Sequence, residues 1–452
     1  MEKVSEERKI ALYLINRVET EKSYINILLN KYLENYKLRG KNRRLITQLV
    51  YGVVCHKNTL DWYLENVCKT KKQDVTLLNI LRMAAYQFIY LDRIPDYAII
   101  NEAVNMAKNY GGKGMGGFVN AVLRDLIRKY KSIKLPSKEA DPIKYYSLSF
   151  SHPEWLIKLY LEKFGENLTE QICEANNITP PLSVRINTLK ISKDEIRNIL
   201  KEKGFEFKES NFIPEVFHII LKSESSLWEM DEYTKSLFQI QDESSALVGL
   251  ALNPGEEDIV IDLCAGPGGK ITHLAALMNN KGVLVGCDIY PARLKAVEQS
   301  SSNFGIKNIK LFLGDARKIF PGDFKEKADK VLADVPCSGL GVLRRRLDAR
   351  WNKDQKDLNK FPELQYEILE TGYNCLKSGG TVVYSTCTII PEENENIIYK
   401  FLENHKNVKI DNLKNILSPQ LHSFINKEGF VKILPSKEHT MDGFFIARLI
   451  RN

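Results

Sequence analysis

Residues 258–270 read Asp-Ile-Val-Ile-Asp-Leu-Cys-Ala-Gly-Pro-Gly-Gly-Lys. Ile259 to Leu263 are mostly branched and apolar, which predicts a short buried strand. The strand runs into a turn of small residues, and apolar side chains from Ile271 to Met278 then recur at helical spacing. A strand, a glycine-rich turn and a helix in this order form the ligand-binding corner of doubly wound α/β folds, where a helix N-terminus offers free N–H groups.

The turn by itself does not identify a ligand. It lacks the G-x-G-x-x-G spacing of a dinucleotide site and the G-K-[ST] ending of a phosphate-binding loop. A tight strand-to-helix turn that binds nothing is an equally good interpretation of these residues alone. The decision therefore depends on the rest of the chain.

The length and composition indicate a soluble, cytoplasmic protein of two or three domains. The chain has 452 residues, no apolar run of membrane-spanning length, and a charged N-terminus that does not resemble a signal peptide. None of its eight cysteines form a C-x-x-C pair, so we expect no structural metal site and reduced thiols. No coiled-coil stripe is present, and a monomer is expected.

The positive charge is concentrated at the N-terminal end. Residues 1–150 contain 26 Lys and Arg against 15 Asp and Glu, a net +11, whereas residues 151–452 contain 39 against 42, a net −3. An excess of this kind suits a polyanionic partner such as nucleic acid. A solvated basic surface that only keeps the domain soluble is the alternative interpretation.

The periodicity of apolar residues predicts three regions. Residues 1–130 show helical spacing throughout, broken at Pro95 and in the glycine cluster 111–117, which predicts an all-α domain. Residues 131–238 predict a connection and a small α/β subdomain. Residues 239–452 alternate strands and helices and predict a mostly parallel, Rossmann-like sheet. Its expected strands are 259–264, 282–288, 309–313, 329–334, 380–386 and, as a final edge strand, 443–449.

Acids and cysteines follow the apolar runs of this sheet. Ligands of such sheets bind at the carboxyl ends of the strands. Three acids and two cysteines at one edge are difficult to explain as packing, because buried carboxylates without a partner cost stability. Asp288 is suitably placed to accept hydrogen bonds from ribose hydroxyls, and Asp315 to meet the amine of an adenine. The remaining strand ends carry Asp334 with Cys337, and Cys387.

Two cysteines in one cleft indicate nucleophilic chemistry. A thiolate can attack an electron-poor carbon such as C6 of a pyrimidine. The attack makes C5 nucleophilic, so that C5 can take a methyl group from a sulfonium donor. Loss of the C5 proton and expulsion of the thiolate then restore the ring.

Residues 258–395 resemble the catalytic domain of RNA cytosine-C5 methyltransferases that use S-adenosylmethionine. The resemblance is carried by Cys264-Ala265-Gly266-Pro267-Gly268-Gly269-Lys270, Asp288, Gly314-Asp315, Asp334-Val335-Pro336-Cys337-Ser338-Gly339 and Ser385-Thr386-Cys387. In the N-terminal region, Asn101-Glu102-Ala103-Val104 and residues 116–124 resemble the NusB family of RNA-binding helical domains. The combination resembles the Sun/Fmu (RsmB-type) family, which methylates a cytosine of bacterial 16S ribosomal RNA, and covers essentially the whole chain.

The resemblance implies a role for each matched residue. Cys387 is expected to be the nucleophile, and Cys337 to assist product release. Asp334 is expected near both cofactor and target base. The expected S-adenosylmethionine site comprises Cys264, Ala265, Gly266, Pro267, Gly268, Gly269, Lys270, Asp288, Asp315 and Asp334.

Basic segments are expected to contact the RNA partner, 16S ribosomal RNA, free or in a partly assembled small subunit. The segment 341–351 fits a substrate-facing loop whose arginines hold phosphate and whose Trp351 stacks or packs. The basic clusters 37–44 and 124–134 are further candidates, with solvated helix faces as the alternative.

Two other functions remain open from the sequence. The same chemistry is compatible with transfer RNA or DNA as the substrate. A non-catalytic RNA-binding assembly or antitermination factor is the second alternative, although the presence of both Cys337 and Cys387 argues against it.

Overall fold

The computed structural model describes residues 3–36, 40–68, 73–220, 236–319 and 324–452. The chain divides into two compact units. One comprises Met1–Ile178 and Leu343–Gln355, and the other comprises Thr179–Val342 and Lys356–Asn452. Among the helices in these described ranges, none is both long and apolar enough to cross a membrane.

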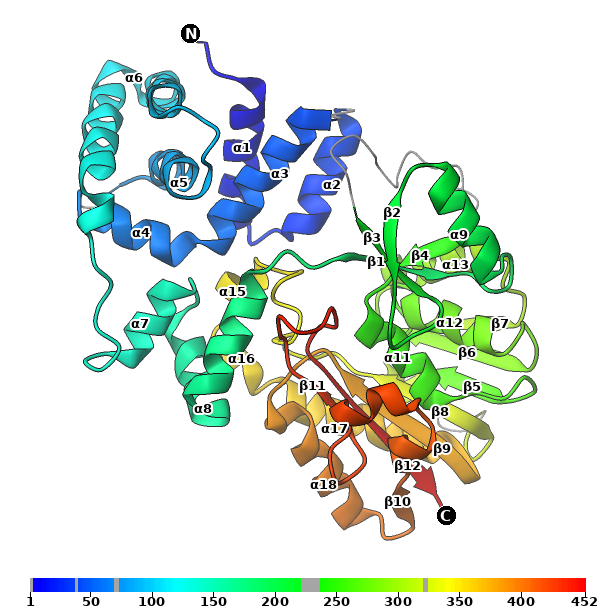
Figure 1. Ribbon diagram of the computed structural model, residues 1–452. Helices are drawn as coiled ribbons and strands as arrows, with labels where there is room; N and C mark the ends of the chain where they lie inside the picture. The colour runs from blue at the N-terminus through cyan, green and yellow to red at the C-terminus, as the bar shows by residue number, and fades with distance from the viewer. Residues whose placement is uncertain (1–2, 37–39, 69–72, 221–235, 320–323) are drawn as a thin grey trace. The chain divides into compact units, whose positions relative to one another are not determined.

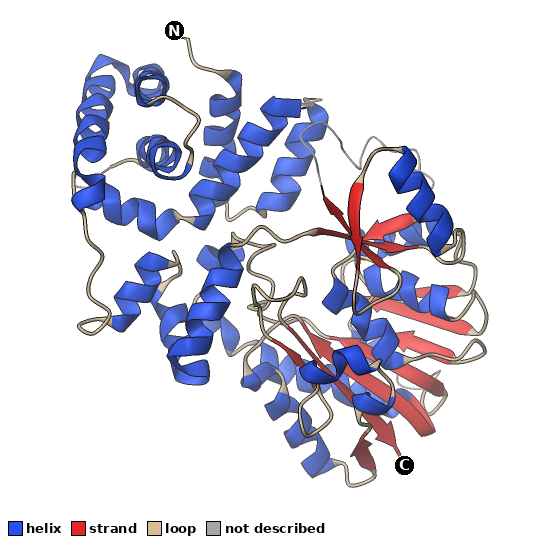
Figure 2. Ribbon diagram, viewed as in Figure 1, coloured by secondary structure: helices blue, strands red, loops and turns tan. Residues whose placement is uncertain are grey.

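In its described residues, the first unit contains helices joined by loops and no strand. The helices are drawn blue in Figure 2. This confirms the all-α fold expected for the N-terminal region. The helices are α1 (Glu6–Thr20), α2 (Ile25–Asn35), α3 (Gly40–Cys55), α4 (Lys57–Glu65), α5 (Val75–Tyr90), α6 (Asp96–Lys129), the 3-10 turn η2 (Tyr130–Ser132), α7 (Pro142–Ser149), α8 (Glu154–Asn177) and α15 (Ala349–Asn352).

Helix α5 shows why this unit folds as it does. Asp74 caps it by accepting hydrogen bonds from the N–H groups of Thr76 and Leu77. Its middle is buried and mostly apolar. The buried Arg82 forms ion pairs with Asp61 and Glu19 and donates a hydrogen bond to the buried Asn79. The expected glycine break falls inside α6 at Gly111 and Gly112, where Gly112 has φ +84°, and the helix then resumes.

The segment Leu343–Gln355 completes the first unit from far along the chain. Leu347 is 5% exposed and belongs to the apolar core of the helices. Trp351 packs against the same core and donates from Nε1 to the carbonyl of Val54 at 2.8 Å. Arg350 is fully buried. Residues separated by about 300 positions in sequence thus share one core.

The second unit contains a small antiparallel sheet in the order β2-β3-β1-β4. Helix α9 begins with a capping box, in which Ser192 and Glu195 exchange hydrogen bonds, and buries Ile196 and Leu200 against this sheet. The elements are β1 (Leu182–Ile186), α9 (Lys193–Glu202), β2 (Glu206–Glu209), β3 (Val216–Ile220) and β4 (Phe238–Ile240).

The larger sheet of the second unit has eight strands in the order β10-β12-β9-β8-β5-β6-β7, with β11 also paired to β12 (Figure 1). The five strands from β9 to β7 in this order are parallel, as expected. The strands are β5 (Ile259–Asp262), β6 (Val283–Asp288), β7 (Ile309–Leu313), β8 (Ala328–Asp334), β9 (Leu376–Thr386), β10 (Val408–Ile410), β11 (Val431–Ile433) and β12 (Phe444–Arg451).

Both faces of this sheet are buried. Along β5, Val260 packs with one apolar cluster and Ile261 with the other, as alternation in a strand requires. The first cluster includes α11, α12 and α13, and the second includes α17 and α18. The helices are α11 (Glu243–Leu252), α12 (Gly269–Leu277), α13 (Pro291–Phe304), α14 (Ala316–Ile319), α16 (Gln355–Leu358), α17 (Phe361–Cys375) and α18 (Glu395–Asn404), with short 3-10 turns η4 (Pro391–Glu393), η5 (Leu413–Asn415) and η6 (Pro419–Phe424).

The expectation of a final edge strand at 443–449 was wrong. Strand β12 runs antiparallel to β9 on one side and is covered by β10 and β11 on the other. Both covering strands have three residues and gave no recognisable pattern. Within the parallel part of the sheet, β5 lies between β6 and β8. The strand order therefore proceeds to one side of β5 for β6 and β7 and to its other side for β8 and β9. Such topological switch points form ligand-binding crevices.

Candidate active site

The turn after β5 is closely packed around its glycines. A side chain at Gly266 would lie 2.4 Å from Oδ2 of Asp288, and Gly268, at φ +117°, is the N-cap of α12. The N–H of Gly266 donates to Oδ2 of Asp288 at 3.1 Å. The structure therefore joins the turn to the acid at the end of the next strand, and only glycine fits at position 266.

The two acids at the ends of β6 and β7 lie in different surroundings. Asp288 is 5% exposed, and its second oxygen accepts from the N–H of Tyr290. Asp315 is paired with Arg317, whose hydrogen bonds lower the pKa of the Asp315 carboxyl. The N–H of Gly314 donates to the carbonyl of Asp288 at 3.0 Å, so the two strand ends are directly connected.

Lys270 and Asp334 form an ion pair at the switch point. Nζ of Lys270 lies 2.8 Å from Oδ2 of Asp334, and the hydroxyl of Ser385 donates to Oδ1 at 2.8 Å. Burial opposes the charge on Lys270, but Asp334 and, to a smaller extent, Cys387 and Asp262 together outweigh burial, and the pKa of Lys270 is raised. The pair fixes a charged lysine and a carboxylate between the ends of β5, β8 and β9.

The two cysteines singled out from the sequence lie in contact. Sγ of Cys337 and Sγ of Cys387 are 3.3 Å apart. Their loops are joined by a hydrogen bond between the hydroxyls of Ser338 and Thr388 at 2.7 Å, and by one from the N–H of Gly341 to the carbonyl of Cys387 at 3.0 Å. We call residues 335–342 the Cys337 loop and residues 386–394 the Cys387 loop.

Three buried polar residues around these loops were missed by sequence reasoning. Glu393 accepts at Oε2 from the N–H of Ser338 and from Nε2 of Gln365, both at 2.8 Å. Asn394 accepts from the Thr386 hydroxyl at 2.5 Å and donates to the Thr388 carbonyl at 3.1 Å. The only signal for Glu393 and Asn394 was their position six and seven residues after Cys387; nothing near Gln365 pointed to it.

Asp262, the last residue of β5, was also missed. It is 1% exposed, and its Oδ1 accepts from the N–H of Cys264, whereas its Oδ2 is buried without a hydrogen-bond partner. Burial, followed by repulsion from Asp334, raises the pKa of Asp262 to about 7. A carboxyl that changes charge near neutral pH thus lies beside the ion pair.

The expectation that Arg350 holds phosphate was wrong. Its guanidinium donates to the carbonyls of Cys55, Ser151 and Asn176 and to Oδ1 of Asn177, at 2.9–3.3 Å, all within the first unit. Arg344 is also buried, at 5% exposed, whereas Arg346 is exposed. The sequence did not reveal the burial of Arg350 because its acceptors are distant in the chain.

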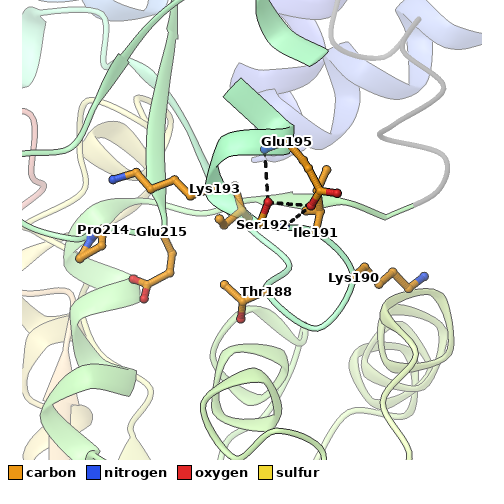
Figure 3. A pocket seen from close by; sticks show the side chains of 9 residues that line it. Thr188, Lys190, Ile191, Ser192, Lys193, Glu195, Pro214 and Glu215 are labelled. Carbon is orange, nitrogen blue, oxygen red and sulfur yellow. Dashed lines mark hydrogen bonds between the residues drawn. The ribbon is translucent and has the colours of Figure 1, made fainter. Parts of the chain in front are cut away.

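Three other cysteines make no contact with Cys337 or Cys387 that the structure shows, and one hollow lies away from the strand ends. Cys287 and Cys375 are buried on β6 and α17, as small core residues, and Cys264 is partly buried in the turn. A hollow of about 440 Å³ lies beside the start of α9, lined by Lys190, Lys193 and Glu215 among others (Figure 3). Its lining includes none of the strand-end acids or cysteines, and its Ser192 and Glu195 are occupied by the capping box.

Three family descriptions match successive parts of the chain. They are the NusB family over residues 5–128, the ferredoxin-like domain of RsmF/B-like methyltransferases over 152–225, and 16S rRNA methyltransferase RsmB/F over 249–450. These matches agree with the all-α region, the small sheet and the large sheet of the structure.

Similar proteins extend over the whole chain. The probable ribosomal RNA small subunit methyltransferase B of Bacillus subtilis (strain 168) is 35% identical over 446 residues, 98% of each chain. The crystal structure of PH0851 has a TM-score of 0.82 at 27% identity and covers 100% of both chains. The structure of NSun6 from Pyrococcus horikoshii with SFG has a TM-score of 0.58 at 26% identity, covering 66% of this chain and 98% of that one. With such identity to a curated relative over nearly its whole length, the chain belongs to the RsmB/F family of 16S rRNA methyltransferases.

Proposed function

We propose that the protein transfers a methyl group from S-adenosylmethionine to C5 of a cytosine in 16S ribosomal RNA, with Cys387 as the nucleophile. The observation that carries the proposal is the contact of two thiols, 3.3 Å apart at the ends of adjacent strands, next to the Lys270–Asp334 pair. Family membership supports methyl transfer, and the names of the relatives support ribosomal RNA as the substrate.

The residues around the glycine turn fit the cofactor. The backbone of the turn packs directly on Asp288 at Gly266, and Asp288, Asp315 and Asp334 lie at or just after the carboxyl ends of β6, β7 and β8, where they offer hydrogen-bond acceptors for an amine or for ribose hydroxyls. When bound, S-adenosylmethionine supplies an electrophilic methyl group on a sulfonium.

The protein's own groups act on the base. Cys387 as thiolate attacks C6, and the electron pair moves to C5, which accepts the methyl group. The C5 proton then leaves and the bond between C6 and sulfur breaks, which returns the thiolate. Cys337, in contact with Cys387, is proposed to assist this release, and Asp334 to hydrogen-bond the cytosine edge. Lys270 is ion-paired with Asp334 and fixes the position of its carboxyl group at the site.

The basic N-terminal region is proposed to bind the RNA around the target. The target base must leave its stack to reach a thiolate, so a loop or end of structured RNA is the favoured substrate. Lys41, Arg44, Arg124 and Arg128 are exposed, whereas residues 37–39 of the first basic cluster lie outside the described residues. The proposal includes three functional regions, 1–130, 131–238 and 239–452, in a cytoplasmic monomer.

The chemistry is tested with labelled S-adenosylmethionine and in vitro transcribed 16S RNA. Wild type, Cys387→Ala and Cys337→Ala are compared for methyl transfer and for a covalent protein–RNA adduct on a denaturing gel. We expect Cys387→Ala to give neither, with activity at least ~10³-fold lower, and Cys337→Ala to accumulate the adduct. Cys337 as the attacking residue would reverse the assignment.

The substrate is tested separately from the chemistry. Transfer to transfer RNA or DNA but not to 16S RNA would support the same chemistry on another nucleic acid. RNA binding with no cofactor binding would support the non-catalytic assembly factor. Arg44→Gln and Arg124→Gln are better probes of RNA contact than deletion of residues 1–130, because that deletion would also expose Leu347 and Trp351. Both substitutions are expected to weaken RNA binding and its salt dependence without changing the folded state.

A further inference from the structure

Two neighbouring residues bracket the two cysteines. Asn394 binds the side chain of Thr386 and the carbonyl of Thr388, the residues on either side of Cys387. Glu393 binds the N–H of Ser338 on one side of Cys337. Nε2 of Gln365 donates to both Glu393 and the carbonyl of Pro336 on the other side, at 2.9 Å.

The three residues that hold the two cysteine loops, Glu393, Asn394 and Gln365, are buried and come from more than one element. Glu393, Asn394 and Gln365 are each fully buried. The hydroxyl of Tyr384 donates to the carbonyl of Glu393 at 2.6 Å, which joins Glu393 to the carboxyl-terminal part of β9. A carboxylate in such surroundings acts on nearby groups with little screening by water.

The two thiols face opposite charges. The hydrogen bond with Cys387, then burial, and after these the charge of Glu393 raise the pKa of Cys337. Cys387, in contrast, contributes to the raised pKa of Lys270, so the ammonium and this thiol attract one another when the thiol ionises. An anion beside one cysteine and a cation beside the other make them chemically unequal, although their sulfurs are in contact.

We propose that Glu393 is a positioning residue that assigns the two cysteines their different roles. Its buried carboxylate fixes the Cys337 loop through Ser338 and Gln365, and its negative charge keeps Cys337 as the thiol, so that the attacking thiolate forms at Cys387. This inference rests on the proposed function for the meaning of the two roles. The electrostatic difference itself requires neither cofactor nor RNA.

The test measures the ionisation of each cysteine in the full-length protein. Iodoacetamide alkylation is followed against pH, with each cysteine quantified by peptide mass spectrometry. Cys337 is measured in a Cys387→Ser protein and Cys387 in a Cys337→Ser protein, each with Glu393, Glu393→Gln and Glu393→Asp. Glutamine keeps the shape but removes the charge, whereas aspartate keeps the charge with a shorter reach. Thermal unfolding checks that each variant is folded.

We expect Glu393→Gln to lower the alkylation midpoint of Cys337 by about one pH unit or more, and that of Cys387 by clearly less. Glu393→Asp is expected to keep the Cys337 midpoint near that of the parent. Equal shifts at both cysteines, or no shift in a folded Glu393→Gln protein, would overturn the proposal. So would a Cys337 midpoint at or below about 8.5, the ordinary cysteine value, in the Cys387→Ser protein alone, a measurement that does not depend on Glu393→Gln folding.

Activity gives a separate readout. If wild type methylates RNA, Glu393→Gln is expected to lower kcat about tenfold or more while KM for RNA stays within about twofold. If wild type methylates none of the tested nucleic acids, the alkylation midpoints still decide the role of Glu393. Failure of the proposed function and failure of this inference are therefore distinguishable.

Discussion

The Cys387 loop is closed by a residue a few positions further along the chain, whereas the Cys337 loop is held by distant elements. Asn394 reaches Thr386 and Thr388, eight and six positions away. Ser338 and Pro336 are held by Glu393 and Gln365, 55 and 29 positions away. Immediately after the Cys337 loop, the chain enters the core of the helical unit. One thiol is thus positioned by local structure and the other by tertiary structure.

Among the substitutions considered, Arg350→Ala is expected to have the largest effect on the helical unit that follows the Cys337 loop. The substitution leaves four buried acceptors without their donor, and we expect it to lower the free energy of unfolding of the helical unit by about 3–5 kcal/mol. Trp62, Trp155 and Trp351 lie in this unit, so tryptophan fluorescence during denaturation reports on it. Arg350→Lys, which keeps a charge and three donors, should lose less. A loss below about 1 kcal/mol for Arg350→Ala would contradict the anchoring role.

Asp262→Asn tests the part of the site next to the Cys337 loop. Asp262 ends β5, which pairs with β8, the strand before the Cys337 loop, and not with β9, the strand before Cys387. An aspartate has a pKa of about 3.9 in an unfolded chain, and the pKa of Asp262 in the folded protein is about 7. Between these values the folded state holds a proton that the unfolded state has lost, so raising the pH destabilises the native protein through this window. The amide does not titrate.

We expect the free energy of unfolding of Asp262→Asn to increase relative to that of wild type as the pH rises. Relative to wild type, the variant should become more stable by about 2–4 kcal/mol between pH 5 and pH 8, as measured by urea unfolding. Asp411→Asn, at a carboxylate paired with Arg448 elsewhere in the unit, is the control and should not show this trend. A constant difference between wild type and Asp262→Asn across this range would contradict the raised pKa.

Asn394→Ala tests the local support of Cys387. Loss of two buried hydrogen bonds should lower the free energy of unfolding by about 2 kcal/mol. If Cys387 is the nucleophile, as proposed, its displacement should lower kcat by about 10²-fold. Asn394→Asp keeps the acceptor for Thr386 but loses the donor to Thr388. Its stability and kcat should lie between those of wild type and those of Asn394→Ala. If Asn394→Ala lowers stability without lowering kcat in the methyl-transfer assay, the residue supports the fold and not the reaction.

The bond between the two loops is expected to have the smallest effect. Ser338→Ala and Thr388→Val, singly and together, form a double-mutant cycle across the hydroxyl pair. We expect a coupling energy of about 1 kcal/mol from thermal or urea unfolding, because a neutral buried hydrogen bond contributes about that amount. A coupling near zero would mean that the loops are positioned independently of each other.

Sequence predicted well those features that depend on neighbouring residues. The strands, the glycine turn and the acids at the strand ends each follow from a local pattern, and the parallel order brought them to one edge. Cys337 and Cys387 were expected in one cleft for the same reason. The roles given to these residues stay predictions until the thiol variants are measured.

What sequence missed depends on contacts between distant residues. Glu393 and Asn394 lie in the run 391–395, whose polar residues give no sign of burial, and only the fold places them beside the cysteines. Arg350 was expected to hold phosphate because arginine seldom is fully buried, and its acceptors lie about 170–300 positions earlier. The short strands β10 and β11 were missed because three residues carry too little periodicity.

The discontinuous helical unit has a consequence for how the protein is made. Residues up to 178 leave the ribosome long before Leu343–Gln355, which supplies Leu347, Arg350 and Trp351 to the same core. At about 5–20 residues per second, that interval is roughly 10–30 s. During it the nascent helices have an incomplete core, open to solvent or to a chaperone. The segment that completes the unit is synthesised after the Cys337 motif and before Cys387, so the order of translation places its final folding step between the appearance of the two thiols.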